Sequence, residues 1–193
     1  MKVDNLEENW SIFSKILSKT DRGEEISAFL EKNDQQILET PARDRSDWVT
    51  SCPGGLVYNS LLTLKHAKTI AATVGANVDP SSLSIVCLLH DIGKIGEPGG
   101  LPYYKLQTSS WHIERGQVYT YEPNIQKMTH PHRSLYILQQ AGIKINHDEF
   151  VAILTSTGFS YDENKFYIGG ENTLVTILQS ALSLTNMVTK RNM

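Results

Sequence analysis

The sequence predicts an all-α fold: a helical bundle that carries a small β-hairpin insertion and begins with a pair of N-terminal helices. Three features of the 193-residue chain predict it. Apolar residues recur at three- and four-residue steps over most of the length, residues 83–89 are almost all apolar, and glycine and proline are concentrated in residues 93–102. The first pattern is typical of amphipathic helices, the second of a helix at the centre of a core, and the third of an irregular connection.

The first 40 residues predict two helices. An apolar stripe on a helix of about 15 residues is formed by Val3, Leu6, Trp10, Phe13 and Leu17. Asp21 and Glu24 match the spacing of a capping box for a second helix. We expect residues 1–40 to be an N-terminal helical extension that packs through Trp10 and Phe13 onto the main domain, residues 41–193. The alternative is a dimerisation element, although the stripe is too short for a coiled coil.

The main domain begins with a connection over residues 40–55 that is rich in proline, glycine, serine and aspartate. Helices are expected at 56–74, where Gly75 is a plausible stop, and from Pro80 to about 90, where Asp79 is the cap. Further helices are expected at about 131–141, at about 147–157 with Asn146 as cap, and at about 171–190. Residues 93–130 look irregular, and WHIERGQVYTY at 111–121 alternates in a way that predicts a short β-hairpin.

Composition excludes several classes of protein. Lysine and arginine number 18 and aspartate and glutamate 21, for a net charge of −3, so the chain lacks the basic excess of a duplex-DNA binder. No apolar run approaches the roughly 18 residues that span a bilayer, and the acidic start MKVDNLEENW differs from a secretory signal. Cys52 and Cys87 are too few for a disulfide framework or a thiolate zinc site. We expect a cytoplasmic protein that does not bind membranes.

His90 and Asp91 are the first candidates for chemistry, because they end the most apolar helix. A charged aspartate there is costly unless a cation compensates it. Adjacent histidine and aspartate side chains at a helix end can both turn toward one cation, and Lys94, four residues after His90, can reach a phosphate oxygen. The plain alternative is a histidine and an aspartate that only end a helix, but the sequence CLLHDIGK is much less frequent by chance than a bare His-Asp pair.

With four other segments, CLLHDIGK at 87–94 resembles the HD superfamily of metal-dependent phosphohydrolases over roughly residues 40–190. The other segments are PGGLVYNSL at 53–61, HPHRS at 130–134, AILTSTG at 152–158 and ILQSALSL at 177–184. The resemblance implies an HD-domain-type helical bundle. If the protein is active, it also implies a divalent metal such as Mn, Fe, Ni or Mg, and nucleotide or nucleic-acid phosphoesters as substrates. Members with this segment order occur in bacteria and in their viruses, so the chain is possibly phage-encoded.

The metal ligands that the resemblance implies are incomplete. His90, Asp91 and His130 match the family pattern, but Asn59, Ser156 and Leu182 stand where the first histidine, a later histidine and the closing aspartate are expected. A divalent cation needs several well-placed nitrogen or oxygen donors; Asn59 is a weak substitute and Leu182 offers none. We therefore expect a degenerate metal site without a resident cofactor. Asp91 should instead pair with Lys94 or an imidazolium, and Leu182 should lie near Leu88, Leu89 and Leu178.

Other residues of the region have two interpretations each. His132 and Arg133 are assigned, with Lys94, to ligand binding, although His132 also fits an ordinary surface histidine. Five aromatic residues gather in the irregular segment over the expected pocket mouth, and they suit either base stacking or packing of a hairpin on the helical body: Tyr103, Tyr104, Trp111, Tyr119 and Tyr121.

Three functional hypotheses remain from the sequence. The first is a non-catalytic domain that binds a nucleotide or another phosphorylated small molecule, or a protein partner. The second is a working phosphohydrolase in which Asp91 and Lys94 are catalytic and His90, Asp91 and His130, with a weak Asn59, hold the metal. The third is a structural protein whose former pocket is part of the core. The oligomeric state is left open.

Overall fold

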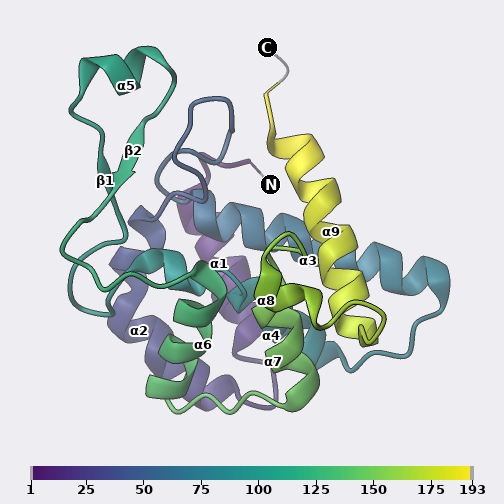
Figure 1. Ribbon diagram of the computed structural model, residues 1–193. Coiled ribbons are helices and arrows are strands. Elements are labelled where there is room, and N and C mark those ends of the chain that lie inside the picture. Colours follow the sequence, from purple (N-terminus) through teal and green to yellow (C-terminus); the bar gives the residue numbers. More distant parts are fainter. Residues whose placement is uncertain (1, 192–193) are drawn as a thin grey trace.

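Three helices form the centre of the molecule. The computed structural model describes residues 2–191, and α3 (Gly55–Val74), α4 (Pro80–Leu89) and α9 (Thr173–Thr189) pack against one another (Figure 1). Their buried side chains include Leu88, Leu89 and Leu178, and Leu182 is half-buried against the same core. The predicted all-α class is confirmed, as is the placing of Leu182 beside the core.

Local signals explain where the central helices begin and end. The Asp79 side chain accepts a hydrogen bond from the backbone N–H of Ser82 and Pro80 is the first helical residue of α4, so both predictions hold. Gly75 ends α3 with φ at 64°, a left-handed conformation that a residue without Cβ adopts at no steric cost. Asn172 caps α9 by accepting from the Val175 N–H.

The N-terminal helices α1 (Leu6–Leu17) and α2 (Gly23–Glu39) share the core of the main domain. Phe13 and Leu17 are buried, and Trp10 stacks on Phe13 with its ring centroid 5.8 Å away. The expected packing through Trp10 and Phe13 is confirmed. The expected capping box is wrong, because α2 starts at Gly23 with Arg22 at the N-cap and no side-chain cap.

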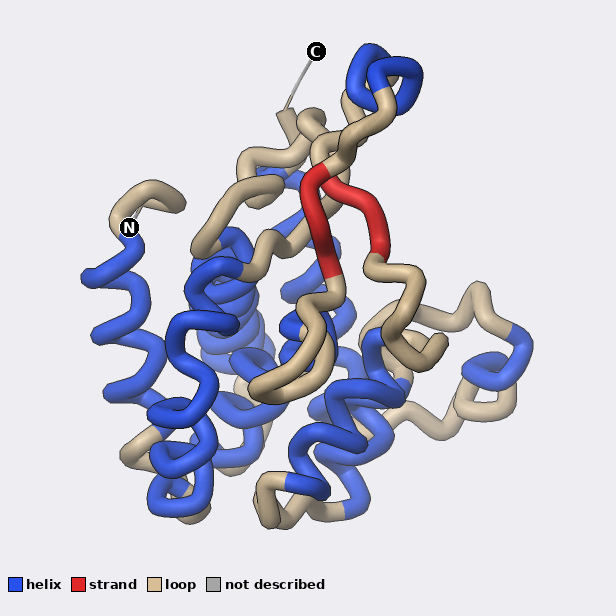
Figure 2. The backbone as a smooth tube through the Cα atoms, turned by 90° about the vertical axis from the view of Figure 1, so that its left-hand side faces the viewer, coloured by secondary structure: helices blue, strands red, loops and turns tan. Residues whose placement is uncertain are grey.

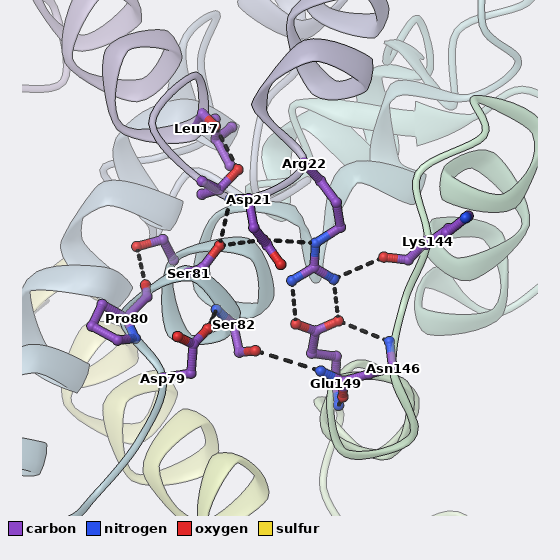
Figure 3. A network of polar contacts seen from close by, with 12 residues as sticks. Leu17, Asp21, Arg22, Asp79, Pro80, Ser81, Ser82, Lys144, Asn146 and Glu149 are labelled. Carbon is purple, nitrogen blue, oxygen red and sulfur yellow. Dashed lines mark hydrogen bonds and ion pairs between the residues drawn. The ribbon is translucent and has the colours of Figure 1, made fainter.

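Asp21 and Arg22 bind other elements instead. The Asp21 N–H donates to Ser81 Oγ on α4, while Arg22 reaches Glu149 on α7 (His147–Leu154). Its two Nη groups donate to the two Glu149 carboxylate oxygens at 2.5 and 2.7 Å (Figure 3), and Glu149 is fully buried. Glu149 also completes the capping box with Asn146 that starts α7. This network connects the turn between α1 and α2 to α4 and α7.

The predicted hairpin exists, but at other residues. Strands β1 (Tyr104–Leu106) and β2 (Tyr119–Tyr121) pair antiparallel, with Tyr104 opposite Tyr121. Between them, residues 110–114 form the short helix α5 (Ser110–Glu114) at the projecting end of the hairpin (Figure 2). The prediction of strands within residues 111–121 is therefore wrong for the first half of that segment, which contains α5. After α5 the chain turns toward β2 at Gly116. Its φ is 80°, and its N–H donates a hydrogen bond to the Ile113 carbonyl oxygen.

The remaining elements carry the site. The 3-10 helix η1 (Ile92–Ile95) follows α4 directly, and α6 (His130–Gln140) packs on it. The short α8 (Asp162–Lys165) lies in the connection between α7 and α9. Within residues 2–191, none of these helices has the length and apolarity that crossing a membrane requires.

Candidate functional site

The apolar helix α4 delivers His90 and Asp91 into the interior. His90 is its C-terminal cap and Asp91 the residue that precedes η1. Lys94 follows in η1, and the three residues are 2%, 9% and 4% exposed, in that order.

Gly93 lets α6 approach this segment closely. A Cβ at Gly93 would lie 2.5 Å from the His130 carbonyl oxygen and 2.7 Å from the Ser134 nitrogen. The Gly93 N–H donates to Ser134 Oγ at 2.9 Å, and the Ser134 hydroxyl donates to the His90 carbonyl at 2.6 Å. These contacts hold the first turn of α6, and with it His130, against the segment that carries His90 and Asp91.

A cavity of about 340 Å³ opens beside these residues. It is bounded by the connection after α2, the end of α4, both strands, the start of α6, the segment after α7, and α9. The lining residues are Ala42, Arg43, Asp44, His90, Asp91, Lys94, Tyr104, Tyr121, His130, Ser156, Thr157, Ser160, Tyr161, Leu182 and Asn186. The volume is at the lower end of the range for small-molecule sites.

Asp91 and Lys94 form a buried ion pair. Lys94 Nζ lies 2.5 Å from Asp91 Oδ2 and donates a second hydrogen bond, of 3.0 Å, to the Ala42 carbonyl oxygen. Burial opposes ionisation of Asp91, but the Lys94 ammonium holds the pKa of this carboxyl below its ordinary value. Burial also lowers the pKa of Lys94, against the attraction of Asp91. The expectation that Asp91 pairs with Lys94 is confirmed.

Both imidazoles of the site are neutral at physiological pH. Burial lowers the pKa of His130 to about 4, and the Lys94 charge acts in the same direction. Burial likewise lowers the pKa of His90, outweighing the opposing attraction of Asp91. His90 Nδ1 lies 3.0 Å from the Cys87 carbonyl oxygen, and His90 Nε2 lies 3.6 Å from Asp91 Oδ2.

Four side chains on the cavity carry a buried polar atom without a hydrogen-bond partner in residues 2–191. These atoms are Arg43 Nε, His90 Nε2, His130 Nδ1 and Ser156 Oγ. Folded proteins pair most of their buried polar atoms, so such a group on one cavity requires an explanation such as a bound ligand, ion or water.

The donor set does not fit a divalent cation. Within residues 2–191, no three His, Cys, Asp or Glu side chains are arranged to hold a metal ion. Leu182 and Ser156, which stand where the resemblance implies carboxylate and imidazole ligands, line the cavity, and Asp91 Oδ2 already binds an ammonium. The Asn59 side chain is buried with its Oδ1 unpartnered, and it is not among the cavity residues of the described chain.

The other predicted residues lie elsewhere. His132 lines a separate, larger groove between α6 and α7, where its Nδ1 is 2.5 Å from Thr129 Oγ1. The Arg133 guanidinium lies over the Tyr103 ring, 5.6 Å from its centroid, and donates to the Gln126 carbonyl.

The sequence did not indicate Arg43 or Asn186, which both line the cavity. The Arg43 guanidinium lies 4.6 Å from the centroid of the Trp48 ring, and its Nη2 donates to Asn186 Oδ1 at 2.5 Å. Arg43 belongs to an irregular connection, where no periodicity indicates direction. The sequence marks Arg43 only as an arginine near the start of the stretch that resembles the HD superfamily.

The aromatic residues divide by position. Tyr104 and Tyr121 lie on the cavity with Tyr161, and their own rings stack at 5.6 Å between centroids. Burial raises the pKa of Tyr104 well above its ordinary value, so its hydroxyl stays protonated. Trp111 is more than half exposed at the far end of the hairpin, next to Arg115. Of the five aromatic residues predicted at the pocket mouth, Tyr104 and Tyr121 therefore line the cavity, and Tyr103, Tyr119 and Trp111 do not.

Comparison with known families gives one match: the sequence model of the HD domain family matches residues 56–163. No curated protein and no solved structure matches the chain. The matched segment contains α3, α4, η1, the hairpin, α6 and α7, and it begins after Arg43 and ends before Leu182.

Proposed function

Because the chain belongs to the HD-domain family, whose members are phosphohydrolase-like, we propose that it uses the family pocket to bind a small phosphorylated molecule without hydrolysing it. One observation carries the proposal: four cavity side chains hold buried, unpartnered polar atoms beside an Asp91 that an ammonium already neutralises. The unpartnered polar atoms support a polar ligand. The pairing of Asp91 with Lys94 argues against a firmly held metal ion, which the activation of water requires.

The charges around the cavity support a ligand with one phosphate group. Arg43 and Lys94 are balanced by Asp44 and Asp91, so the cavity has no formal charge excess. Affinity must then come from directed hydrogen bonds, for which the Arg43 guanidinium, planar and always charged, is the best suited group. The Asp44 carboxylate would repel additional phosphate charge. His132 and Arg133 have no part in this proposal because they lie off the cavity.

Elemental analysis and ligand titration together test the proposal. We expect protein purified without added metal or chelator to contain no stoichiometric manganese, iron or nickel. Glycerol phosphate should bind it and perturb the NMR signals of cavity residues. Arg43→Gln should weaken this binding about tenfold or more, because a hydrogen bond to a charged group is lost. Arg45→Gln, in the same connection but exposed and off the cavity, is the matched control and should bind as wild type does.

The competing function is a phosphohydrolase with a reduced ligand set. The unpartnered nitrogens of His90 and His130 favour it, since neutral imidazole is a common metal ligand. Hydrolysis of 4-nitrophenyl phosphate that depends on added manganese and is abolished by Asp91→Ala would establish this function and refute the proposed one.

A further inference from the structure

His90 has a fixed tautomer. Its Nδ1 lies 3.0 Å from the carbonyl oxygen of Cys87, one turn earlier in α4. A carbonyl oxygen only accepts hydrogen bonds, so the proton of the neutral ring belongs on Nδ1, which donates it to Cys87. Nε2 is then a bare, buried acceptor on a residue that lines the cavity.

No group of the described chain, residues 2–191, donates a hydrogen bond to this acceptor. Asp91 Oδ2 lies 3.6 Å from His90 Nε2, and an ionised carboxylate is itself only an acceptor. The Lys94 ammonium donates to Asp91 and to the Ala42 carbonyl. His90 Nε2 and Asp91 Oδ2 are therefore both hydrogen-bond acceptors, and no proton lies between them.

We infer that the ligand presents an O–H or N–H donor to His90 Nε2, and that His90 thereby selects hydroxyl- or amino-bearing phosphate esters over esters with a plain alkyl group. This rests on the proposed function and adds a specificity-determining residue to it. A site that leaves a buried acceptor unpaired discriminates against the ligand lacking the donor, since the unpaired group loses its hydration without replacement.

The tautomer is tested first, on the free full-length protein. Two-dimensional ¹⁵N NMR of the histidine rings distinguishes a protonated from a bare nitrogen, and His90→Phe identifies the His90 signals. We expect Nδ1 protonated and Nε2 bare at neutral pH. A protonated Nε2 in the free protein overturns the inference, whatever ligand the cavity takes.

The selectivity is tested with two probes of equal chain length, glycerol 3-phosphate and n-propyl phosphate. Wild-type protein should bind the first at least about tenfold more tightly. His90→Phe should reduce that ratio to about one. His112→Phe, which replaces an exposed histidine on α5, should keep the wild-type ratio.

The outcomes separate the two proposals. Equal binding of both probes to wild type overturns the role of His90 and leaves phosphate binding intact; it would mean that water alone satisfies Nε2. An unchanged preference in His90→Phe also overturns it. If neither probe binds, the proposed function fails, and the inference that rests on it fails with it.

Discussion

Asp91 is a carboxylate in the interior, and its ionised form exists there only because a cation lies against it. Lys94 supplies one positive charge at 2.5 Å from Oδ2, and the Ala42 carbonyl oxygen accepts a second hydrogen bond from the ammonium. The two ions are coupled, so the effects of removing them should not add.

A double-mutant cycle measures this coupling. Lys94→Met alone should lower the free energy of unfolding by about 3 kcal/mol, because it leaves a buried carboxylate uncompensated. The double variant Asp91→Asn with Lys94→Met should lie much closer to wild type, since neither charge remains. Urea denaturation of Lys94→Met, Asp91→Asn and the double variant at neutral pH gives the three losses that the cycle compares. A loss in the double variant equal to the sum of the two single losses would show that the pair is not coupled.

At the scale of elements, the helices of the HD segment were predictable and the irregular connections were not. The starts of α4 and α7 follow from local signals, Asp79 with Pro80 and Asn146. The Asp21–Glu24 pattern failed because the Asp21 carboxylate accepts a hydrogen bond from the Ser81 hydroxyl of α4 and does not cap α2. Alternation at 111–121 failed in its first half because α5 forms there, and sequence alone does not weigh a short helix against a short strand.

The candidate site divides in the same way. His90, Asp91 and Lys94 were predictable because they end or follow the most apolar helix, and His130 was predictable from the resemblance to the HD superfamily. Arg43 comes from a connection without periodicity, so only the folded chain brings it to the cavity. His132 lies two helical steps of about 100° from His130 and is turned away from the cavity, whereas Arg133 lies over the Tyr103 ring.

The approach of α6 to η1 predicts an intolerant glycine. Gly93→Ala should lower the free energy of unfolding by about 2 kcal/mol or more, because the new methyl group meets backbone atoms of His130 and Ser134. Gly170→Ala is the matched control: its Cβ would have no close neighbour nearer than Tyr167 O at 3.7 Å. Thermal unfolding of both variants is the measurement, and equal melting temperatures would contradict the close packing of α6.

On the scale of the whole molecule, the N-terminal helices behave as part of the domain. Phe13, Leu17 and Ile26 are buried in the same cluster as the residues of α4 and α9. The family match covers residues 56–163 and leaves this pair outside. Polar as well as apolar contacts join α1 and α2 to the rest of the domain, because Arg22 at the turn between these helices binds Glu149 on α7.

This bridge makes stability depend on pH. Burial alone would raise the pKa of Glu149, but the hydrogen bonds and charge of Arg22, with those from Ser82 and Asn146, hold it below its ordinary value of 4.5. A carboxyl whose pKa is lower in the folded state stabilises the fold above its unfolded pKa, and this contribution is lost as the pH falls through the folded pKa. At pH 7, Glu149→Gln should cost about 3 kcal/mol, because Arg22 loses its charge partner. The difference between wild type and variant should shrink steadily below pH 4.5, as measured by urea denaturation across that range. A difference that stays constant down to pH 3 would mean that the Arg22–Glu149 pair does not join the N-terminal helices to the domain through its charge.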